Sequence, residues 1–248
     1  MSNIRQKLDI SAYLVLGPEN TLGRDVGEIV KVAVECGFTC VQVRSKVASA
    51  KEMISLCRDC AKVISELGKQ DRVALLVDDR LDVVLAAREE GIKVDGIHVG
   101  QSDIPVSVCR KFLGEDSIVG LSAPASRLIE YVKNTDVSDI DYFGAGPLHE
   151  TQTKPDCGMD ENGVVITRTF EELSELAKIS PIPVVVGGGV KVRDLASLKK
   201  TGVDGFFVVS AVASAEDPQK ASSELVSTWN QAKKKSCLKL LRQDVNAL

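Results

Sequence analysis

Short apolar runs rich in Val, Ile and Leu recur along the chain, and a polar loop and a stretch with apolar residues at helical spacing follow each of them. This rhythm is typical of parallel strands that are joined by covering helices. Eight runs are predicted to be strands, at residues 13–16, 38–43, 73–77, 96–99, 117–121, 141–143, 183–186 and 205–209. The intervening stretches predict helices at residues 25–35, 51–67, 81–89, 126–134, 170–178 and 194–200.

Eight strands with helical crossovers in 248 residues predict an α/β protein with a single TIM (β/α)8 barrel. We expect the barrel domain to span residues 1–235 and a short C-terminal helical tail to span residues 236–248. From Lys233 onward, apolar residues could line one helix face, so we expect the tail to pack on the barrel or on a neighbouring subunit of a homo-oligomer. A doubly wound open sheet is the alternative, but its glycine-rich phosphate turn is absent after the first predicted strand.

The net charge of the chain indicates which classes of binding partner to expect. The chain carries 31 basic and 35 acidic residues, a net charge of −4, and it has no long basic run interleaved with aromatic residues. Nucleic acid is therefore not an expected partner. Because no hydrophobic leader and no run of roughly 18 apolar residues occurs, we expect no membrane association and a cytoplasmic location.

The chain has seven cysteines, an odd number that argues for free thiols in a protein without an export signal. Cys57 and Cys60 form a C-x-x-C pattern in the middle of a predicted helix. A second Cys or His pair at zinc spacing is missing, so we expect two small core residues rather than a metal or redox site.

Polar side chains gather where the predicted strands end, and in a barrel these ends converge on one face. The polar residues that follow six of the strands are Gln42, Arg44, Lys46, Asp78, Asp79, Gln101, Asp103, Ser122, Thr151, Thr153, Lys154 and Ser210. The cations among them predict a strongly anionic ligand, and Asp79 and Asp103 are candidate ligands of Mg²⁺. An ion pair between Arg44 and Asp79 that only rims the barrel mouth is the structural alternative.

A second anion site is predicted after the seventh and eighth strands. Gly187, Gly188 and Gly189 would let a phosphate group approach backbone N–H groups, and a helix that opens near Lys191 could add its dipole. His98 is expected to be a packed, hydrogen-bonded histidine, and His149 is left without a role.

Four segments together resemble the motifs of the thiamine-phosphate synthase family. Residues 41–46 (VQVRSK) resemble its Q-x-R-x-K, and residues 79–82 (DRLD) resemble the end of its N-D-R-x-D. Residues 97–103 (IHVGQSD) resemble its H-x-G-Q-x-D, and residues 142–154 (YFGAGPLHETQTK) resemble its G-x-G-P-x-x-x-T-x-T-K. The motifs occur in order over roughly residues 12–213, each after a predicted strand.

The resemblance implies a Mg²⁺-dependent transferase that joins hydroxymethylpyrimidine diphosphate and thiazole phosphate and releases pyrophosphate. It implies that the first substrate is bound by Gln42, Arg44, Lys46, Asp78, Ser122, Thr151, Thr153 and Lys154. Among these, Arg44, Lys46 and Lys154 would act as the catalytic cations. It also implies that Asp79 and Asp103 hold Mg²⁺, and that the thiazole phosphate lies at Gly188, Val209 and Ser210.

Three features depart from the family pattern, and one of them is the loop at residues 155–163, which is longer and more acidic than usual. Asp78 stands where the family usually has Asn, and Pro124 stands where it often has His. A thiazole tautomerase, a related barrel that uses the histidine at the latter position, is the nearest alternative function. A non-catalytic barrel that only binds a phosphorylated ligand is another.

Overall fold

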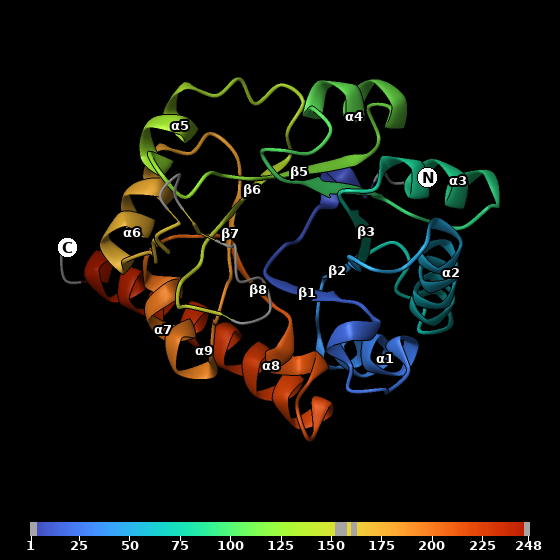
Figure 1. The fold of residues 1–248 in the computed structure, drawn as a ribbon. Coiled ribbons are helices and arrows are strands. Elements are labelled where there is room, and N and C mark those ends of the chain that lie inside the picture. The colour runs from blue at the N-terminus through green and yellow to red at the C-terminus, as the bar shows by residue number, and fades with distance from the viewer. Residues whose placement is uncertain (1–3, 152–157, 160–162, 246–248) are drawn as a thin grey trace.

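The computed structural model describes residues 4–151, 158–159 and 163–245, with side chains described through residue 232. Its eight parallel strands close into a barrel in chain order (Figure 1). They are β1 (Ala12–Leu16), β2 (Cys40–Val43), β3 (Ala74–Asp78), β4 (Gly96–Val99), β5 (Ile118–Ser122), β6 (Tyr142–Ala145), β7 (Val184–Val186) and β8 (Gly205–Val208). The predicted barrel is confirmed, and the open sheet is wrong because β1 pairs with β8.

Helices surround the ring of strands (Figure 1). They are α1 (Val26–Cys36), α2 (Ala50–Glu66), α3 (Leu81–Glu89), α4 (Val106–Leu113), α5 (Leu128–Asn134), α6 (Phe170–Ile179), α7 (Val192–Lys200), α8 (Ser210–Ala213) and α9 (Pro218–Val245). Two short 3₁₀ turns, at Arg5–Lys7 and Pro18–Asn20, precede them. Each of the six predicted helices is found within a few residues of its expected bounds.

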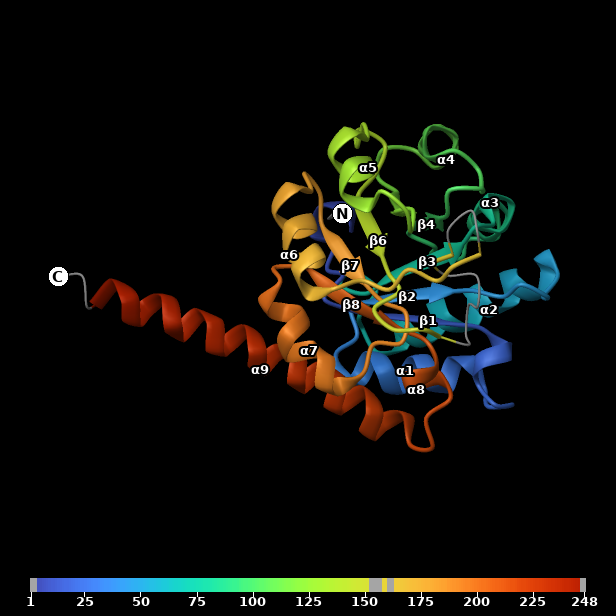
Figure 2. The same cartoon turned by 60° about the vertical axis from the view of Figure 1, so that its left-hand side comes forward.

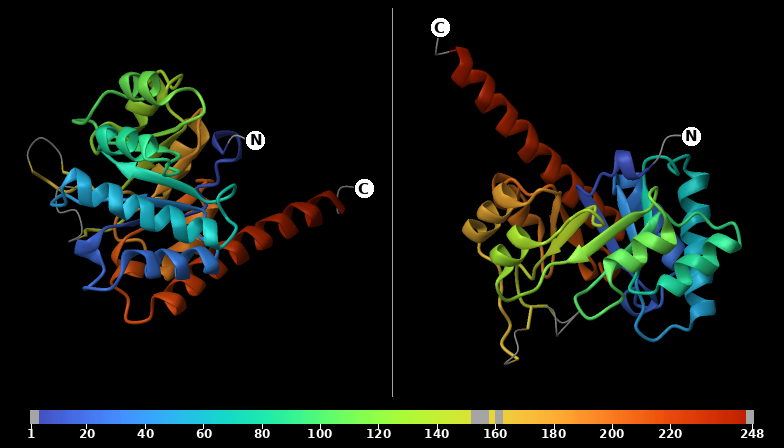
Figure 3. Two further views of the ribbon diagram at one scale, coloured as in Figure 1. Left: turned by 90° about the vertical axis from the view of Figure 1, so that its right-hand side faces the viewer. Right: turned by 90° about the horizontal axis from the view of Figure 1, so that it is seen from above.

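The C-terminal helix α9 starts earlier than the predicted tail and runs unbroken through residues 235 and 236. Its first half packs against α7 and α1, where Trp229 is buried with its ring centroid 5.4 Å from that of Phe206. The Lys199 ammonium lies over the indole, 4.1 Å from its centroid. Figures 2 and 3 show that α9 then continues past the barrel, so its C-terminal end projects away from the other elements.

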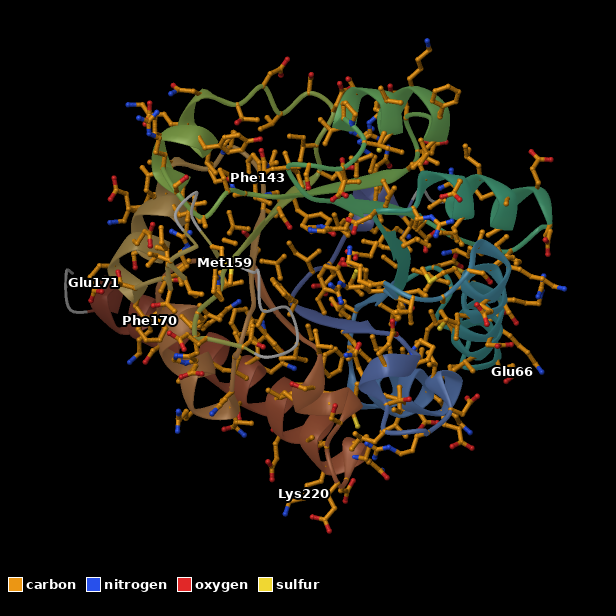
Figure 4. All side chains as sticks on the ribbon, in the orientation of Figure 1. Glu66, Phe143, Met159, Phe170, Glu171 and Lys220 are labelled. Atoms are coloured by element: carbon orange, nitrogen blue, oxygen red, sulfur yellow. The ribbon has the colours of Figure 1, made fainter. Side chains whose placement is uncertain are left out.

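Alternate residues of each strand face opposite sides of the sheet, which divides the core into two layers. The outward residues pack against the helices in one large cluster, which includes Leu14, Val41, Leu75 and Phe143. The inward residues form a smaller cluster inside the barrel. Figure 4 shows side chains filling both spaces, with Phe143 labelled.

The barrel interior is narrow, so large inward side chains need small neighbours. Tyr13 and Tyr142 are fully buried there, with ring centroids 6.0 Å apart. The strand register places Gly120 directly beside both Tyr142 and His98. A Cβ atom on Gly120 would overlap the Tyr142 ring. The glycine therefore makes the room that the tyrosine occupies.

The five cysteines whose side chains are described are all free. Cys57 and Cys60 are completely buried in the cluster between α2 and the sheet, which confirms that they are core residues. Burial raises the pKa of the Cys57 thiol to about 12 and shifts that of Cys60 in the same direction. Both side chains therefore remain thiols at neutral pH.

Gly120→Ala is expected to lower the free energy of unfolding by about 1–3 kcal/mol, because the added methyl group overpacks the interior against Tyr142. Urea denaturation measures the change. In a Tyr142→Leu background the loss should be smaller, since the ring that clashes is gone. An unchanged urea midpoint in the single variant would show that the two residues are not in contact.

In the folded protein, Cys57 and Cys60 should resist alkylation by iodoacetamide at pH 8, because they are buried and protonated. Among the five cysteines whose side chains are described, the partly exposed Cys36 should be modified first. Peptide mapping by mass spectrometry, with the urea-unfolded chain as the control, measures the rates. If Cys57 reacts equally fast in folded and unfolded protein, the assignment to the core is wrong.

Candidate active site

A cavity opens at the C-terminal ends of the strands and extends into the barrel. The empty space in it is about 860 Å³, including the space open to solvent at its mouth. The sequence-predicted site residues that line it are Gln42, Arg44, Asp78, Ser122, Thr151, Gly188, Val209 and Ser210. They come from β2, β3 and β5, from the segments that follow β2, β6, β7 and β8, and from the start of α8. The structure thus brings these eight residues together.

Cations and carboxylates pair at the mouth of this cavity. The Arg44 Nε atom lies 3.1 Å from Asp78 Oδ2, and both side chains are largely buried. Lys46 forms an ion pair with Asp79, and its Nζ atom is 3.7 Å from Asp78 Oδ2. The expected alternative of an Arg44–Asp79 pair is therefore not what forms, because Arg44 pairs with Asp78, and Lys46 is the cation that pairs with Asp79.

Backbone geometry directs Asp79 toward these groups. Its φ angle of 60° lies in the left-handed region that residues other than glycine rarely adopt. A hydrogen bond of 2.8 Å from its N–H group to the His98 carbonyl oxygen anchors this turn to β4. The strained conformation sits directly after β3, where the side chain can meet both Lys46 and Asp103.

Asp79 and Asp103 are close enough to influence each other's protonation. Burial is the largest single influence on the pKa of Asp79 and raises it, but the hydrogen bonds with Lys46, Asp103 and Asp78 and the charge of Lys46 together outweigh burial and hold the pKa below its usual value. For Asp103, burial and then the hydrogen bond with Asp79 raise the pKa. Asp103 Oδ2 also accepts a bond of 2.8 Å from the Gly100 N–H group. The two predicted metal ligands therefore face each other.

These carboxylates fit a magnesium ion in their chemistry. Magnesium is typically held by one or two carboxylates, with substrate phosphates and water completing its shell. The described residues contain no cluster of three or more His, Cys, Asp or Glu side chains, which a cage made only of protein ligands would need. Asp79 and Asp103 instead supply the two carboxylates that suit a magnesium ion shared with substrate phosphates.

The opposite side of the cavity is built from the loops after β7 and β8. Gly188 has a φ angle of 79°, and a Cβ atom there would lie 2.6 Å from the Pro147 Cα atom. Only glycine fits this conformation and this space. The N–H groups of Leu148 and His149 donate to the Gly188 carbonyl oxygen, at 3.0 Å and 2.9 Å, which joins this loop to the one after β6.

His149 is half-exposed beside this loop. Its Nε2 atom lies 3.0 Å from Asp194 Oδ2. The same carboxylate oxygen accepts a hydrogen bond of 2.9 Å from the Lys191 N–H group at the start of α7. The histidine therefore helps to hold the N-terminus of α7 near the glycine loop.

Sequence reasoning missed two buried phenols, Tyr13, which lines the cavity, and Tyr142, which contacts Tyr13. Tyr13 contacts both Gln42 and Tyr142, and its oxygen is 2.9 Å from that of Tyr142. His98 Nδ1 lies 2.9 Å from the Tyr142 oxygen, and its Nε2 atom lies 2.9 Å from Ser122 Oγ. The expected hydrogen-bonded histidine is confirmed, and it also lines the cavity. The signal that could have found Tyr13 and Tyr142 is a phenol at an inward strand position.

Two predicted substrate ligands, Thr153 and Lys154, lie outside the described residues. Lys46, Asp79 and Asp103 lie beside the mouth of the cavity and are linked to its wall through Asp78. Among the helices within the described ranges, none is both long and apolar enough to cross a membrane.

Comparisons with known proteins point to one family. A family model described as thiamine monophosphate synthase matches residues 12–212. The thiamine-phosphate synthase of Clostridium tetani is 33% identical over 226 residues, which is 91% of this chain and 99% of the relative. That of Corynebacterium efficiens is 35% identical over 230 residues, 93% of this chain and all of the relative. A solved thiamine phosphate pyrophosphorylase from Pyrococcus furiosus superposes with a TM-score of 0.72 at 29% identity, covering 93% of this chain and 99% of that one.

Proposed function

The chain belongs to the thiamine-phosphate synthase family, and we propose that it joins hydroxymethylpyrimidine diphosphate to thiazole phosphate and releases pyrophosphate. One observation carries the proposal: two regions whose chemistry suits anions lie in or beside the same cavity. Arg44 and the Lys46–Asp79 pair lie on one side, and the Gly188 loop with Ser210 lies on the other. A transferase that holds one phosphorylated substrate on each side needs this arrangement.

The reaction breaks the bond between the methylene carbon and the diphosphate oxygen, and the electron pair leaves with pyrophosphate. The thiazole nitrogen forms the new bond to that carbon. Negative charge grows on the leaving group, so cations fixed beforehand stabilise the transition state more than the ground state. We assign this work to Arg44 and Lys46, with Lys154, which lies outside the described residues, as a third cation.

Arg44 and Lys46 are each paired with a carboxylate. Their carboxylate partners keep the mouth of the site nearly neutral, which limits the cost of holding cations in a partly buried place. A diphosphate that enters must therefore exchange with Asp78 and Asp79 for these cations. Gln42, Ser122, Thr151 and Thr153 complete the proposed site for the first substrate.

Asp79 and Asp103 are the residues that would hold Mg²⁺, since they face each other beside the same cations. The ion would offset charge on the departing pyrophosphate. Gly188, Val209 and Ser210 are assigned to the phosphate of the thiazole substrate. A cytoplasmic location and a homo-oligomeric state remain predictions from the sequence.

The purified protein, mixed with hydroxymethylpyrimidine diphosphate, thiazole phosphate and Mg²⁺, should form thiamine phosphate and pyrophosphate. Mass spectrometry detects the first product, and a coupled phosphate assay detects the second. Binding of both substrates without product would identify a non-catalytic barrel. Isomerisation of the thiazole alone would identify a tautomerase.

Asp79→Ala should lower kcat/KM by about 10²–10³-fold, because it removes a proposed metal ligand and the partner that orients Lys46. Steady-state kinetics across a series of Mg²⁺ concentrations measures the loss. Circular dichroism should stay unchanged, since the residue lies at the mouth and not in the core. Asp59→Ala, at an exposed position of α2, is the matched control. Turnover at the wild-type level in Asp79→Ala would refute the assigned role.

A further inference from the structure

A continuous chain of hydrogen bonds crosses the barrel interior below the ion pairs. Five bonds connect six side chains from six different strands, in the order Ser122, His98, Tyr142, Tyr13, Gln42 and Asp78. Each hydroxyl group carries one proton, so it can donate only one hydrogen bond. The direction of one bond therefore constrains the direction of the next.

The direction of the hydrogen bonds is set at the end of the chain where Asp78 lies. A carboxylate only accepts hydrogen bonds, and Asp78 Oδ2 already faces the guanidinium of Arg44. At Oδ1, the Gln42 amide nitrogen must be the donor. The amide oxygen of Gln42 then points the other way, toward Tyr13, and only the Tyr13 hydroxyl can donate in that contact.

The direction of the Tyr13 hydrogen bond in turn determines which groups donate in the contacts of Tyr142 and His98. The one proton of Tyr13 is already donated, so Tyr142 donates to the Tyr13 oxygen. The Tyr142 oxygen must in turn accept from a proton on His98 Nδ1. Burial, first among several causes, raises the pKa of both phenols well above the usual value, so both keep the protons that the chain requires.

The Ser122 end of the chain is then determined. In a neutral imidazole that carries its proton on Nδ1, the Nε2 atom accepts. The hydroxyl group of Ser122 therefore donates to His98 Nε2. Its proton is turned away from the cavity, and its oxygen is left to accept a hydrogen bond from whatever enters.

We propose that Asp78 is a positioning residue that fixes His98 as its Nδ1–H tautomer and presents the Ser122 oxygen to the cavity as an acceptor. The acceptor would select a ring that offers an N–H group, such as the amino group of an aminopyrimidine. This selectivity rests on the proposed function, whereas the direction of the chain does not.

An asparagine at position 78 should reverse the whole chain. Arg44 requires an acceptor, so the side-chain oxygen of Asn would face the guanidinium in place of Asp78 Oδ2. The amide NH₂ group of the Asn would then face Gln42 and donate to its oxygen. Every later bond would invert in turn, which would leave His98 protonated on Nε2 and the Ser122 proton directed at the cavity.

The test is ¹⁵N NMR of histidine-labelled protein without ligands at pH 8. The chain contains two histidines, so His149→Gln assigns the spectrum. Two-bond ¹H–¹⁵N correlations distinguish the two tautomers. We expect His98 to be the Nδ1–H tautomer in the wild-type protein and the Nε2–H tautomer in Asp78→Asn.

Asp59→Asn makes the same chemical change on the exposed face of α2 and should leave the His98 spectrum unchanged. An Nε2–H tautomer or an imidazolium in the wild-type protein would overturn the proposal. So would an unchanged spectrum in Asp78→Asn. If that variant does not fold, the wild-type spectrum alone still decides the tautomer.

The selectivity is measured by calorimetry with unreactive hydroxymethylpyrimidine and an analogue that lacks the ring amino group. The wild-type protein should prefer the amino compound roughly tenfold, about one hydrogen bond, and Asp78→Asn should lose most of this preference. A tautomer switch with an unchanged preference would refute the selectivity. Absence of turnover in the product assay, with the expected tautomers present, would refute the proposed function and leave the chain direction intact.

Discussion

The narrow interior of a closed eight-stranded barrel is the constraint on which this structure depends. Every second residue of each strand points into it, and the space holds few large side chains. Tyr13 and Tyr142 fit because Gly120 leaves room for a ring. Both tyrosines are buried there, so their hydroxyl groups need partners. The hydrogen-bond chain through Gln42 and His98 meets that need, so packing and polar organisation follow from one geometric limit.

The charged groups at the mouth of the cavity are subject to a second constraint, which is the cost of burying charge. Cations held ready for an anionic ligand are costly in a partly buried place unless something offsets their charge. Asp78 and Asp79 provide that offset, and Arg44 is held by Asp78 at 3.1 Å. These pairs fix the positions of the cations, so the site is preorganised. A ligand gains only the difference between its own contacts and those that it displaces.

Much of the fold could be predicted from the sequence, because the strands carry clear apolar runs and the glycines mark helix ends. The positions of Gln42, Asp78 and Ser122 could be predicted as well, since each comes at the end of a strand. The short helix α4 (Val106–Leu113) was not among the predicted elements, and its eight residues give only two turns of periodicity. The start of α9 at residue 218 was also missed.

The partners of the site residues were harder to predict. Arg44 pairs with Asp78 instead of Asp79 because the backbone at Asp79 turns into the left-handed region, which depends on its anchor to β4. The contact of Tyr13 with Tyr142 joins residues 129 positions apart. Local pattern carries no information about such a pair. The contact can be recognised only once the barrel closes and the side chains from β1 and β6 face the same interior.

The proposed assignment has a thermodynamic consequence that follows from the paired charges. If a diphosphate drew Lys46 away from Asp79, the carboxylate would lose its partner and be left beside Asp103. Two neighbouring carboxylates without a cation repel each other, so a divalent ion would then be bound more favourably than before. Coupling of this kind is reciprocal, and a bound ion must favour the diphosphate by the same factor. The ion pairs at the mouth would thus link the two binding events, without any change in the barrel itself.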